Sequence, residues 1–179
     1  MSTFTLDPTH SSVDFSIRHL MISRVRGSFG NVAAELEIDE ATSLPTRVSS
    51  TIEVASIDTK VADRDAHLRS ADFFDAETFP QLTFRSTSVS GNPQGFEILG
   101  NLTIHGVTKP VTLAAEYDGR TTDPWGNDRI AYSAKAKISR KEFGMTWNQA
   151  LEAGGIMVGD EVEIALSIQA VKAKVAVPA

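Results

Sequence analysis

The sequence contains no cysteine, so disulfide bonds and thiolate metal ligands cannot contribute to the fold. It also contains no apolar run that approaches the roughly 18 residues of a membrane-spanning helix. Residues 1–8 have neither the basic start nor the apolar stretch of a secretory signal peptide. We therefore expect a protein without an integral membrane segment, and we expect it in the cytoplasm.

Positive charge is scarce as well. The 17 Lys and Arg residues are outnumbered by 23 Asp and Glu residues, which gives a net charge of -6. Proteins that bind the nucleic-acid backbone usually carry a basic face, so we expect no nucleic-acid partner. The length of 179 residues fits a single domain that spans residues 1–179.

Short motifs for metal binding or catalysis are missing too. The four histidines have no spacing such as His-x-x-x-His, so no metal site is expected. There is no Gly-x-Ser-x-Gly turn, and without cysteine there is no thiol nucleophile. We name no catalytic residue and expect no cofactor, although a Ser-His-Asp triad assembled from distant positions stays open.

Alternation of apolar and polar residues with a period of two is the strongest positive signal, and it is typical of half-buried strands. Turn sequences at residues 91–95, 105–110 and 122–127 separate the alternating runs. Consecutive antiparallel hairpins with one apolar face predict an all-β fold, either a meander closed into a barrel or a sandwich. The alternating runs cover residues 13–18, 96–104, 111–118, 130–139 and 161–169, and shorter strands are expected near 29–38, 47–54 and 81–89.

Two segments interrupt the strand pattern. Residues 63–71 lack β-branched residues and predict a short helix, with Asp63 as its N-cap. Residues 148–153 are compatible with a helical turn that ends at Gly154 and Gly155. We therefore expect one or two short helices at the ends of the sheet.

A series of short motifs follows in a fixed order along nearly the whole chain. They are Asp7–Ser11 followed by a Val-x-Phe-x-Ile strand that ends at His19, then Gly27–Gly30, Ala55–Thr59, Arg64–Leu68, Asp72–Asp75, Phe79–Phe84, Gly100–Thr108, Arg140–Met145 and Val158–Val162. No single motif is specific, but the ordered set resembles the YceI-like polyisoprenoid-binding family. The resemblance implies an antiparallel, lipocalin-like barrel of about eight strands with an apolar pore. Many relatives are exported, and the leader they carry is not seen in residues 1–8.

Strand parity provides candidate ligand-binding residues for such a pore. Small inward residues such as Ala134 permit a cavity, although a packed interior of alternating small and large side chains is the open alternative. His19 and Arg140 continue the apolar parity to strand ends, where they would meet a head group, and an arginine fork suits a diphosphate. The alternatives are a core histidine bonded to the backbone and a surface arginine. The candidates are Phe15, Ile17, His19, Leu82, Phe84, Ile98, Leu102, Leu113, Tyr132, Ala134, Arg140, Met145, Trp147, Ile164 and Leu166.

The segment 145–157 is rich in apolar side chains, which form either an adaptable lid over the pore or ordinary packing at the barrel end. They are Met145, Trp147, Leu151, Ile156 and Met157.

Three histidines are interpreted as structural. His10 is expected to bond to the backbone of its turn. His67, beside Arg64 and Asp65, is expected on a helix that an Arg–carboxylate pair and a histidine bond hold to the barrel. His105 precedes a glycine in a turn.

The expected function is non-enzymatic binding or sequestration of a long apolar isoprenoid lipid, a polyprenyl diphosphate or quinone tail, inside the pore. Each buried CH₂ group contributes about 0.8 kcal/mol, so a long chain binds with few polar contacts. Two alternatives stay open: an enzyme acting on a lipid or isoprenoid through His19, His67 or Asp14, and a packed barrel acting through its outer surface. The pattern permits a homodimer, and nothing in the sequence fixes one.

Overall fold

One antiparallel sheet of 11 strands makes up most of the structure, a computed structural model that describes residues 1–152 and 154–174. In that part of the chain one α-helix, α1 (Ala62–Arg69), and three short 3-10 helices, η1 (Pro8–His10), η2 (Val54–Ser56) and η3 (Arg140–Phe143), lie between strands. The strands are β1 (Ser2–Leu6), β2 (Ser12–His19), β3 (Ser23–Phe29), β4 (Val32–Ile38), β5 (Pro45–Glu53), β6 (Ile57–Asp58), β7 (Gln81–Asn92), β8 (Gly95–Ile104), β9 (Val107–Thr122), β10 (Asp128–Ser139) and β11 (Val158–Lys172).

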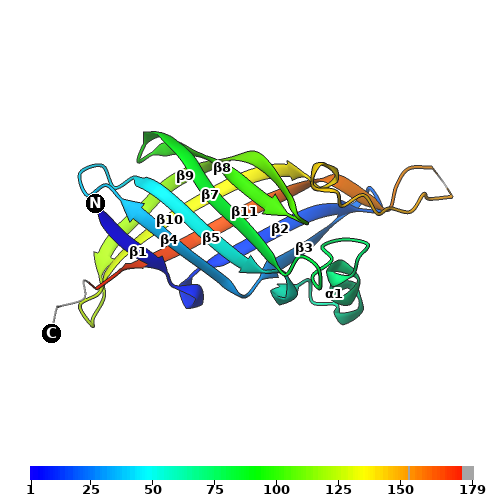
Figure 1. Cartoon of the computed structure of the whole chain (residues 1–179), viewed down its shortest axis with the longest axis horizontal. Helices are drawn as coiled ribbons and strands as arrows, with labels where there is room; N and C mark the ends of the chain where they lie inside the picture. Colours follow the sequence, from blue (N-terminus) through cyan, green and yellow to red (C-terminus); the bar gives the residue numbers. More distant parts are fainter. Residues whose placement is uncertain (153, 175–179) are drawn as a thin grey trace.

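Eight of the strands close into a barrel. The pairing order β1-β4-β5-β7-β8-β9-β10-β11 returns to its start, because β11 also pairs with β1, with Phe4 opposite Lys172. Figure 1 shows these strands wrapping around a common axis. The predicted all-β antiparallel barrel of about eight strands is therefore confirmed, and the sandwich is excluded.

The strand β11 has two partners along one edge. β1 pairs with its C-terminal part, with Leu6 opposite Ala170, and β2 pairs with the part before it, with Val13 opposite Leu166. The short helix η1 joins these two partners. β3 pairs with β2, so the β2–β3 hairpin extends the wall at one end.

The two ends of the barrel differ. We call the end with the β2–β3 tip and the loop 144–157 the mouth end, and the end with the β9–β10 turn the closed end. The register places these turns at opposite ends, because His19 lies opposite Val158 at the start of β11 and Arg129 lies opposite Val171 near its finish. In Figure 1 the loop 144–157 and the β2–β3 tip project together, far from the β9–β10 turn.

The helical segments and one strand depart from the sequence predictions. The helix α1 is present, but its N-cap is Val61, so Asp63 does not cap it. Residues 148–152 form no helix, since Ala150 instead pairs with Ile156 in an isolated bridge; position 153 lies outside the described residues. The strand expected at residues 29–38 is the end of β3 and all of β4. The three predicted turns do connect β7–β8, β8–β9 and β9–β10.

Candidate functional site

A cavity of about 310 Å³ lies inside the barrel, and its surface is almost entirely apolar. Along β11 it is lined from Val158 at the mouth end to Ile168 toward the closed end. At ~3.3 Å per residue, this stretch corresponds to roughly 30 Å. The interior is therefore a long, narrow hollow and not a core filled by side chains.

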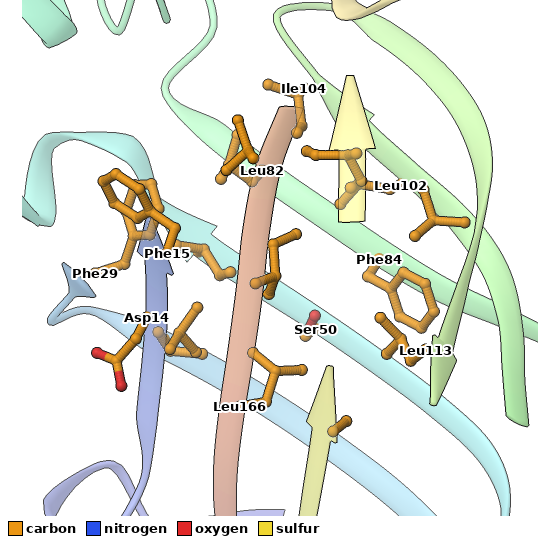
Figure 2. A pocket seen from close by; sticks show the side chains of 18 of the residues that line it. Asp14, Phe15, Phe29, Ser50, Leu82, Phe84, Leu102, Ile104, Leu113 and Leu166 are labelled. Carbon is orange, nitrogen blue, oxygen red and sulfur yellow. The ribbon is translucent and has the colours of Figure 1, made fainter. Parts of the chain in front are cut away.

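All 15 candidate ligand-binding residues line this cavity. Figure 2 shows several of them, with Leu82, Phe84, Leu102, Leu113 and Leu166 gathered around the hollow from four strands. Strand parity accounts for the candidates on β2 and on β7 to β11, although β-bulges shift the register on β7, β9 and β11. That these side chains contact a ligand stays a prediction.

The sequence reasoning missed a second part of the wall. β4 and β5 contribute Ala34, Val48, Ser50 and Ile52, which alternate inward but include a small and a polar side chain. Figure 2 shows Ser50 facing the hollow. The alternation in residues 48–52 could have identified these residues as part of the wall. It was overlooked because a polar residue, Ser50, stands at one of the inward positions.

The closed end is sealed by apolar packing. Phe4, Ile38 and Ile130 are fully buried there, with exposed fractions of 0%. The hydroxyl of Tyr132 donates a hydrogen bond of 2.7 Å to the carbonyl oxygen of Ser43. Burial raises the pKa of Tyr132, so this hydroxyl keeps its proton and its bond. Apolar side chains of the described residues therefore fill the barrel at this end.

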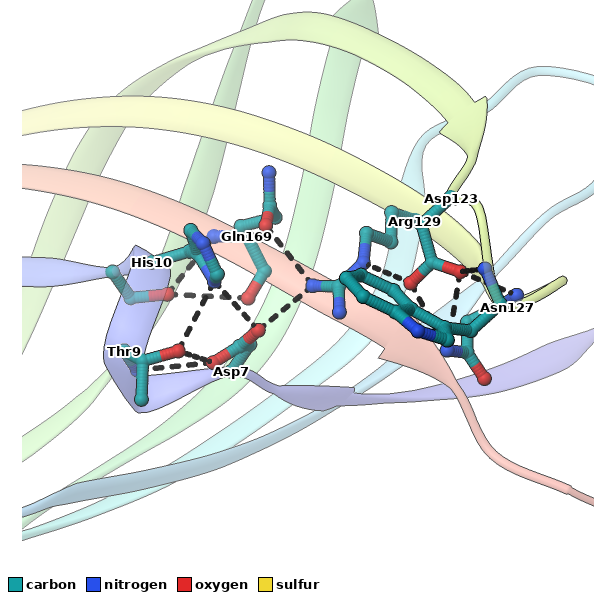
Figure 3. A network of polar contacts seen from close by, with 9 residues as sticks. Asp7, Thr9, His10, Asp123, Asn127, Arg129 and Gln169 are labelled. Carbon is teal, nitrogen blue, oxygen red and sulfur yellow. Dashed lines mark hydrogen bonds and ion pairs between the residues drawn. The ribbon is translucent and has the colours of Figure 1, made fainter.

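A polar network ties the N-terminal segment to the closed end (Figure 3). The Arg129 guanidinium donates to Asp7 at 2.7 Å, to Asp123 at 2.7 Å and to the side chain of Gln169 at 3.1 Å. Asp7 also caps η1 by accepting from the Thr9 backbone amide at 3.0 Å. The network thus joins the start of η1, β10, β11 and the β9–β10 turn.

His10 belongs to this network, and its predicted partner was wrong. Its Nδ1 lies 2.9 Å from Oδ2 of Asp7 and 3.0 Å from the Thr9 hydroxyl, so it bonds to side chains and not to turn backbone. The carboxylate that caps η1 is the stronger acceptor, which explains the preference.

We expect the network to make the free energy of unfolding depend on pH. Hydrogen bonds from Thr9, Arg129 and His10 hold the pKa of Asp7 well below its ordinary value of 3.8. A lowered folded-state pKa gives stabilisation that is present above the unfolded pKa of about 4 and is lost as the pH falls through the folded pKa. The free energy of unfolding should therefore decrease on acidification.

Asp7→Asn tests this directly. In urea unfolding from about pH 7 to about pH 3, the stability difference between the native protein and D7N should shrink as the pH falls. Asp63→Asn, at an exposed carboxylate on α1, is the control and should leave the pH profile unchanged. A difference between native and D7N that stays constant with pH would contradict the assignment.

Aromatic side chains cover the mouth end. The ring of His67 on α1 lies 4.7 Å from the Trp147 ring and 5.0 Å from the Phe73 ring, in edge-to-face geometry. His67 Nε2 is also 2.8 Å from Oδ2 of Asp72. Both His67 and Trp147 line the cavity. The helix α1 and the segment around Trp147 thus form one cover beside the mouth.

The expected Arg–carboxylate pair on α1 is not formed. Arg64 donates from Nε to the Thr59 hydroxyl and from Nη2 to the Thr59 carbonyl, each at 2.7 Å. Asp65 instead accepts from the Thr59 amide at 2.8 Å and from its hydroxyl at 2.5 Å. Thr59 therefore links α1 to the segment before it through both Arg64 and Asp65. This role could not be inferred from the position of Thr59 in the sequence.

Arg140 is not a surface arginine, since only 2% of it is exposed. Its Nε donates to the carbonyl of Gly159 at 2.7 Å, and its Nη1 donates to those of Met145 and Trp147 at 2.8 Å. Its Nη2 donates to the carbonyl of Val158 at 3.2 Å. Burial lowers the pKa of Arg140.

These bonds limit what Arg140 can offer a ligand. A guanidinium has five N–H groups, and four of those of Arg140 are taken by carbonyl oxygens. At most one donor is left toward the cavity. Its main role is to hold both ends of the loop 144–157 on the barrel.

The other mouth residues divide into two groups. His19, Met145, Trp147 and Met157 line the cavity, whereas Leu151 and Ile156 do not, so the apolar loop contributes only partly to the cover. Within the described residues the His19 ring forms no hydrogen bond, which leaves it available at the mouth.

His105 agrees with its structural interpretation. Its Nδ1 lies 3.2 Å from the Phe143 carbonyl oxygen, and its ring packs against Phe79.

Potential metal ligands do not cluster in the described part of the chain. No group of three or more His, Asp or Glu side chains there is arranged to hold a metal ion. No helix in residues 1–152 and 154–174 has both the length and the apolarity to cross a membrane.

A closed antiparallel barrel around one narrow apolar cavity defines a class of ligand-enclosing barrels, of which the lipocalins are one example. Within that class, the family model of the YceI-like domain matches residues 4–170, and this chain belongs to the YceI-like family. The resemblance inferred from the motifs is therefore confirmed.

Relatives support this assignment in sequence and in structure. The protein YceI of Salmonella newport is 41% identical over 165 residues, which cover 92% of this chain and 83% of the relative. The crystal structure of the Campylobacter jejuni YceI protein is 30% identical, covers 88% of this chain and 91% of that chain, and has a TM-score of 0.77. A domain of Saccharophagus degradans, described as polyisoprenoid binding, shares the fold with a TM-score of 0.69 at 14% identity, over 97% of this chain and 100% of that chain.

Proposed function

We propose that the barrel binds one isoprenoid lipid, with the apolar chain in the cavity and the head group at the mouth beside His19, and releases it chemically unchanged. The observation that carries this proposal is the cavity itself, which is long, narrow and lined almost entirely by apolar side chains. A slender hydrocarbon chain complements such a wall, whereas a compact polar substrate would leave its polar groups without partners.

The size of the cavity supports a chain of limited length. Its volume of about 310 Å³ is at the lower end of the ~300–1,000 Å³ typical of ligand pockets. Because each buried CH₂ contributes about 0.8 kcal/mol, a few isoprene units inside the barrel are enough for tight binding. A polyprenyl diphosphate or a quinone would place its polar end outside, near the mouth.

The comparisons support the same ligand class. The Saccharophagus degradans domain shares this fold and is described as polyisoprenoid binding. Fold likeness alone does not transfer a ligand, but here it coincides with a cavity whose lining suits that ligand.

His67, one of the three residues that a catalytic function would use, has no nucleophile bonded to it. His67 is bonded to Asp72, as a general base often is, yet no Ser or Thr hydroxyl in the described chain bonds to its ring. Its ring is instead packed between Phe73 and Trp147. We therefore propose binding without turnover. The cytoplasmic location and a homodimer stay predictions.

The test is native mass spectrometry of the freshly purified protein, followed by organic extraction and analysis of the released lipid. We expect a stoichiometric adduct of isoprenoid mass, or its appearance when a prenyl diphosphate or a quinone is added to lipid-free protein. Recovery of the added lipid with its mass unchanged would support binding without reaction. No adduct under either condition would refute the proposal.

A further inference from the structure

Four large apolar side chains are exposed together at the mouth end. Leu20, Met21 and Ile22 form the turn between β2 and β3, with exposed fractions of 38%, 56% and 85%, and Ile156 in the facing loop is 39% exposed. We call these four side chains the apolar tip. Large apolar side chains gathered on the surface of a soluble barrel indicate an interaction site.

The backbone of the turn is strained in order to present them. Leu20 has a φ of 53° and Met21 a φ of 62°, both in the left-handed region. Asn and Gly normally fill such hairpin positions, because other side chains clash with the backbone there. The chain thus keeps two large apolar residues at positions where local conformational energy favours small or polar ones.

The turn of the apolar tip contacts the facing loop, and both segments adjoin residues that line the cavity. The Leu20 amide donates to the Met157 carbonyl at 2.8 Å. Met21 packs directly on Gly155, because a Cβ at that glycine would lie 2.3 Å from the Met21 sulfur. His19 and Met157, which directly adjoin Leu20 and Ile156 in the chain, both line the cavity. An object that covers the tip would therefore lie at the mouth.

Positive charge lies just behind the tip on the β2–β3 hairpin, and Arg18 also borders the cavity. Arg18 is directly opposite Arg24, and Arg26 follows two pairs further along, opposite Ser16. Glu163 pairs with Arg24 at 3.2 Å, while Arg18 and Arg26 form no ion pair among the described residues. Like charges on opposed strand positions destabilise a hairpin, so a partner with negative charge would relieve this arrangement.

We propose that the apolar tip docks the mouth of the barrel on an anionic lipid bilayer. Its apolar side chains enter the boundary between head groups and acyl chains, and Arg18 and Arg26 meet lipid phosphates. The docking deepens the proposed function, because it lets an apolar chain pass between the bilayer and the cavity without crossing water.

A second copy of the chain fits this surface less well. A stable protein interface buries at least about 1,200 Å² in total, far more than four side chains supply. A symmetric dimer would also bring the two arginine clusters together. The bilayer is therefore the occupant that matches both the apolar area and the charge.

The test is vesicle flotation with the full chain, using phosphatidylcholine vesicles with and without phosphatidylglycerol. We expect binding to the anionic vesicles that weakens with added salt. Leu20→Asn combined with Met21→Gly removes two apolar side chains, so it should reduce binding by about tenfold or more. The same double variant relieves the backbone strain, so its melting temperature should stay the same or rise, which separates loss of docking from loss of folding.

Two controls isolate the contributions. Trp125→Ser removes an exposed aromatic side chain at the closed end and should leave vesicle binding unchanged. Arg26→Gln should weaken binding to anionic vesicles by about fivefold, whereas Arg47→Gln, the same change on β5, should not.

The outcomes are distinct from those of the lipid-loading test. Equal vesicle binding by the native protein and the tip variant, or none by either, would overturn the docking proposal, whatever lipid the cavity holds. Self-association that disappears in the tip variant, without vesicle binding by the native protein, would also overturn it and identify the tip as a contact between copies. Vesicle binding that depends on the tip in a protein that never loads lipid would support docking while refuting the proposed function.

Discussion

Replacing Ala134 with Phe is expected to abolish lipid loading while the barrel stays folded. Ala134 lies on β10 opposite Ala115 of β9 and Leu166 of β11, and all three line the cavity. The two adjacent alanines leave the hollow wide at this point. A phenyl ring there would block the path of the chain. Losing even four buried CH₂ groups costs about 3 kcal/mol, so affinity should fall by at least about a hundredfold.

Ala165→Phe is the matched control. Ala165 is exposed on the outer face of β11, so the same substitution there should leave loading unchanged. Ser50→Leu, on the other side of the cavity, provides a second and gentler obstruction if A134F proves unstable. Lipid occupancy is measured by native mass spectrometry and folding by thermal unfolding. Full loading of well-folded A134F and S50L would exclude the cavity as the binding site.

Among the substitutions proposed for this protein, Arg140→Met is expected to lower the free energy of unfolding the most. The substitution leaves the carbonyl oxygens of Gly159, Met145 and Trp147 without their side-chain donor, whereas that of Val158 keeps the bond from Asn148 Nδ2. Losing several hydrogen bonds from a buried charged group should cost about 3 kcal/mol after the relief of its desolvation. For a chain of this size, that corresponds to a fall of about 10 °C in melting temperature.

Lys141→Met removes the neighbouring exposed cation and should change stability little. Arg140→Lys should recover only part of the loss, because an ammonium with three donors cannot reach four carbonyls. Thermal unfolding and proteolysis of the loop 144–157 measure the two effects. If R140M unfolds at the native temperature, the guanidinium does not anchor the loop.

The strands that sequence predicted best are those whose apolar face is unbroken. On β8 and β10 the inward residues follow the period of two throughout, and on β9 they do so from Val111 to Tyr117, before a β-bulge. Fold class and the main cavity wall were therefore predictable. β3 was not predicted as a separate strand because Gly27 stands at an inward position. The Phe15 ring fills that place, since a Cβ on Gly27 would lie 2.4 Å from it. The residues around Gly27 do not reveal that a side chain from another strand fills its inward position.

The mouth end was harder to predict for a similar reason. Arg140 continued the inward parity correctly, but its burial depends on carbonyl groups up to 19 residues away in the chain. His67 lines the cavity only because α1 is oriented by Thr59 and packed on Trp147. Strand parity cannot orient a helix. Candidate residues on strands were therefore predictable, whereas the roles of loop and helix residues were not.

The pairing of both β1 and β2 with β11 has a consequence for folding during synthesis on the ribosome. β1 and β2 are made first, yet both find a partner in β11, which is made last, as the pairs Phe4–Lys172 and Val13–Leu166 show. At a synthesis rate of 5–20 residues per second, the first strand waits about 10 to 30 s for the last. During that time its hydrogen-bonding edge and apolar face have only part of their final neighbours. The nascent chain therefore completes its fold only after translation is nearly finished, and any factor that binds nascent chains has this interval in which to protect β1 and β2.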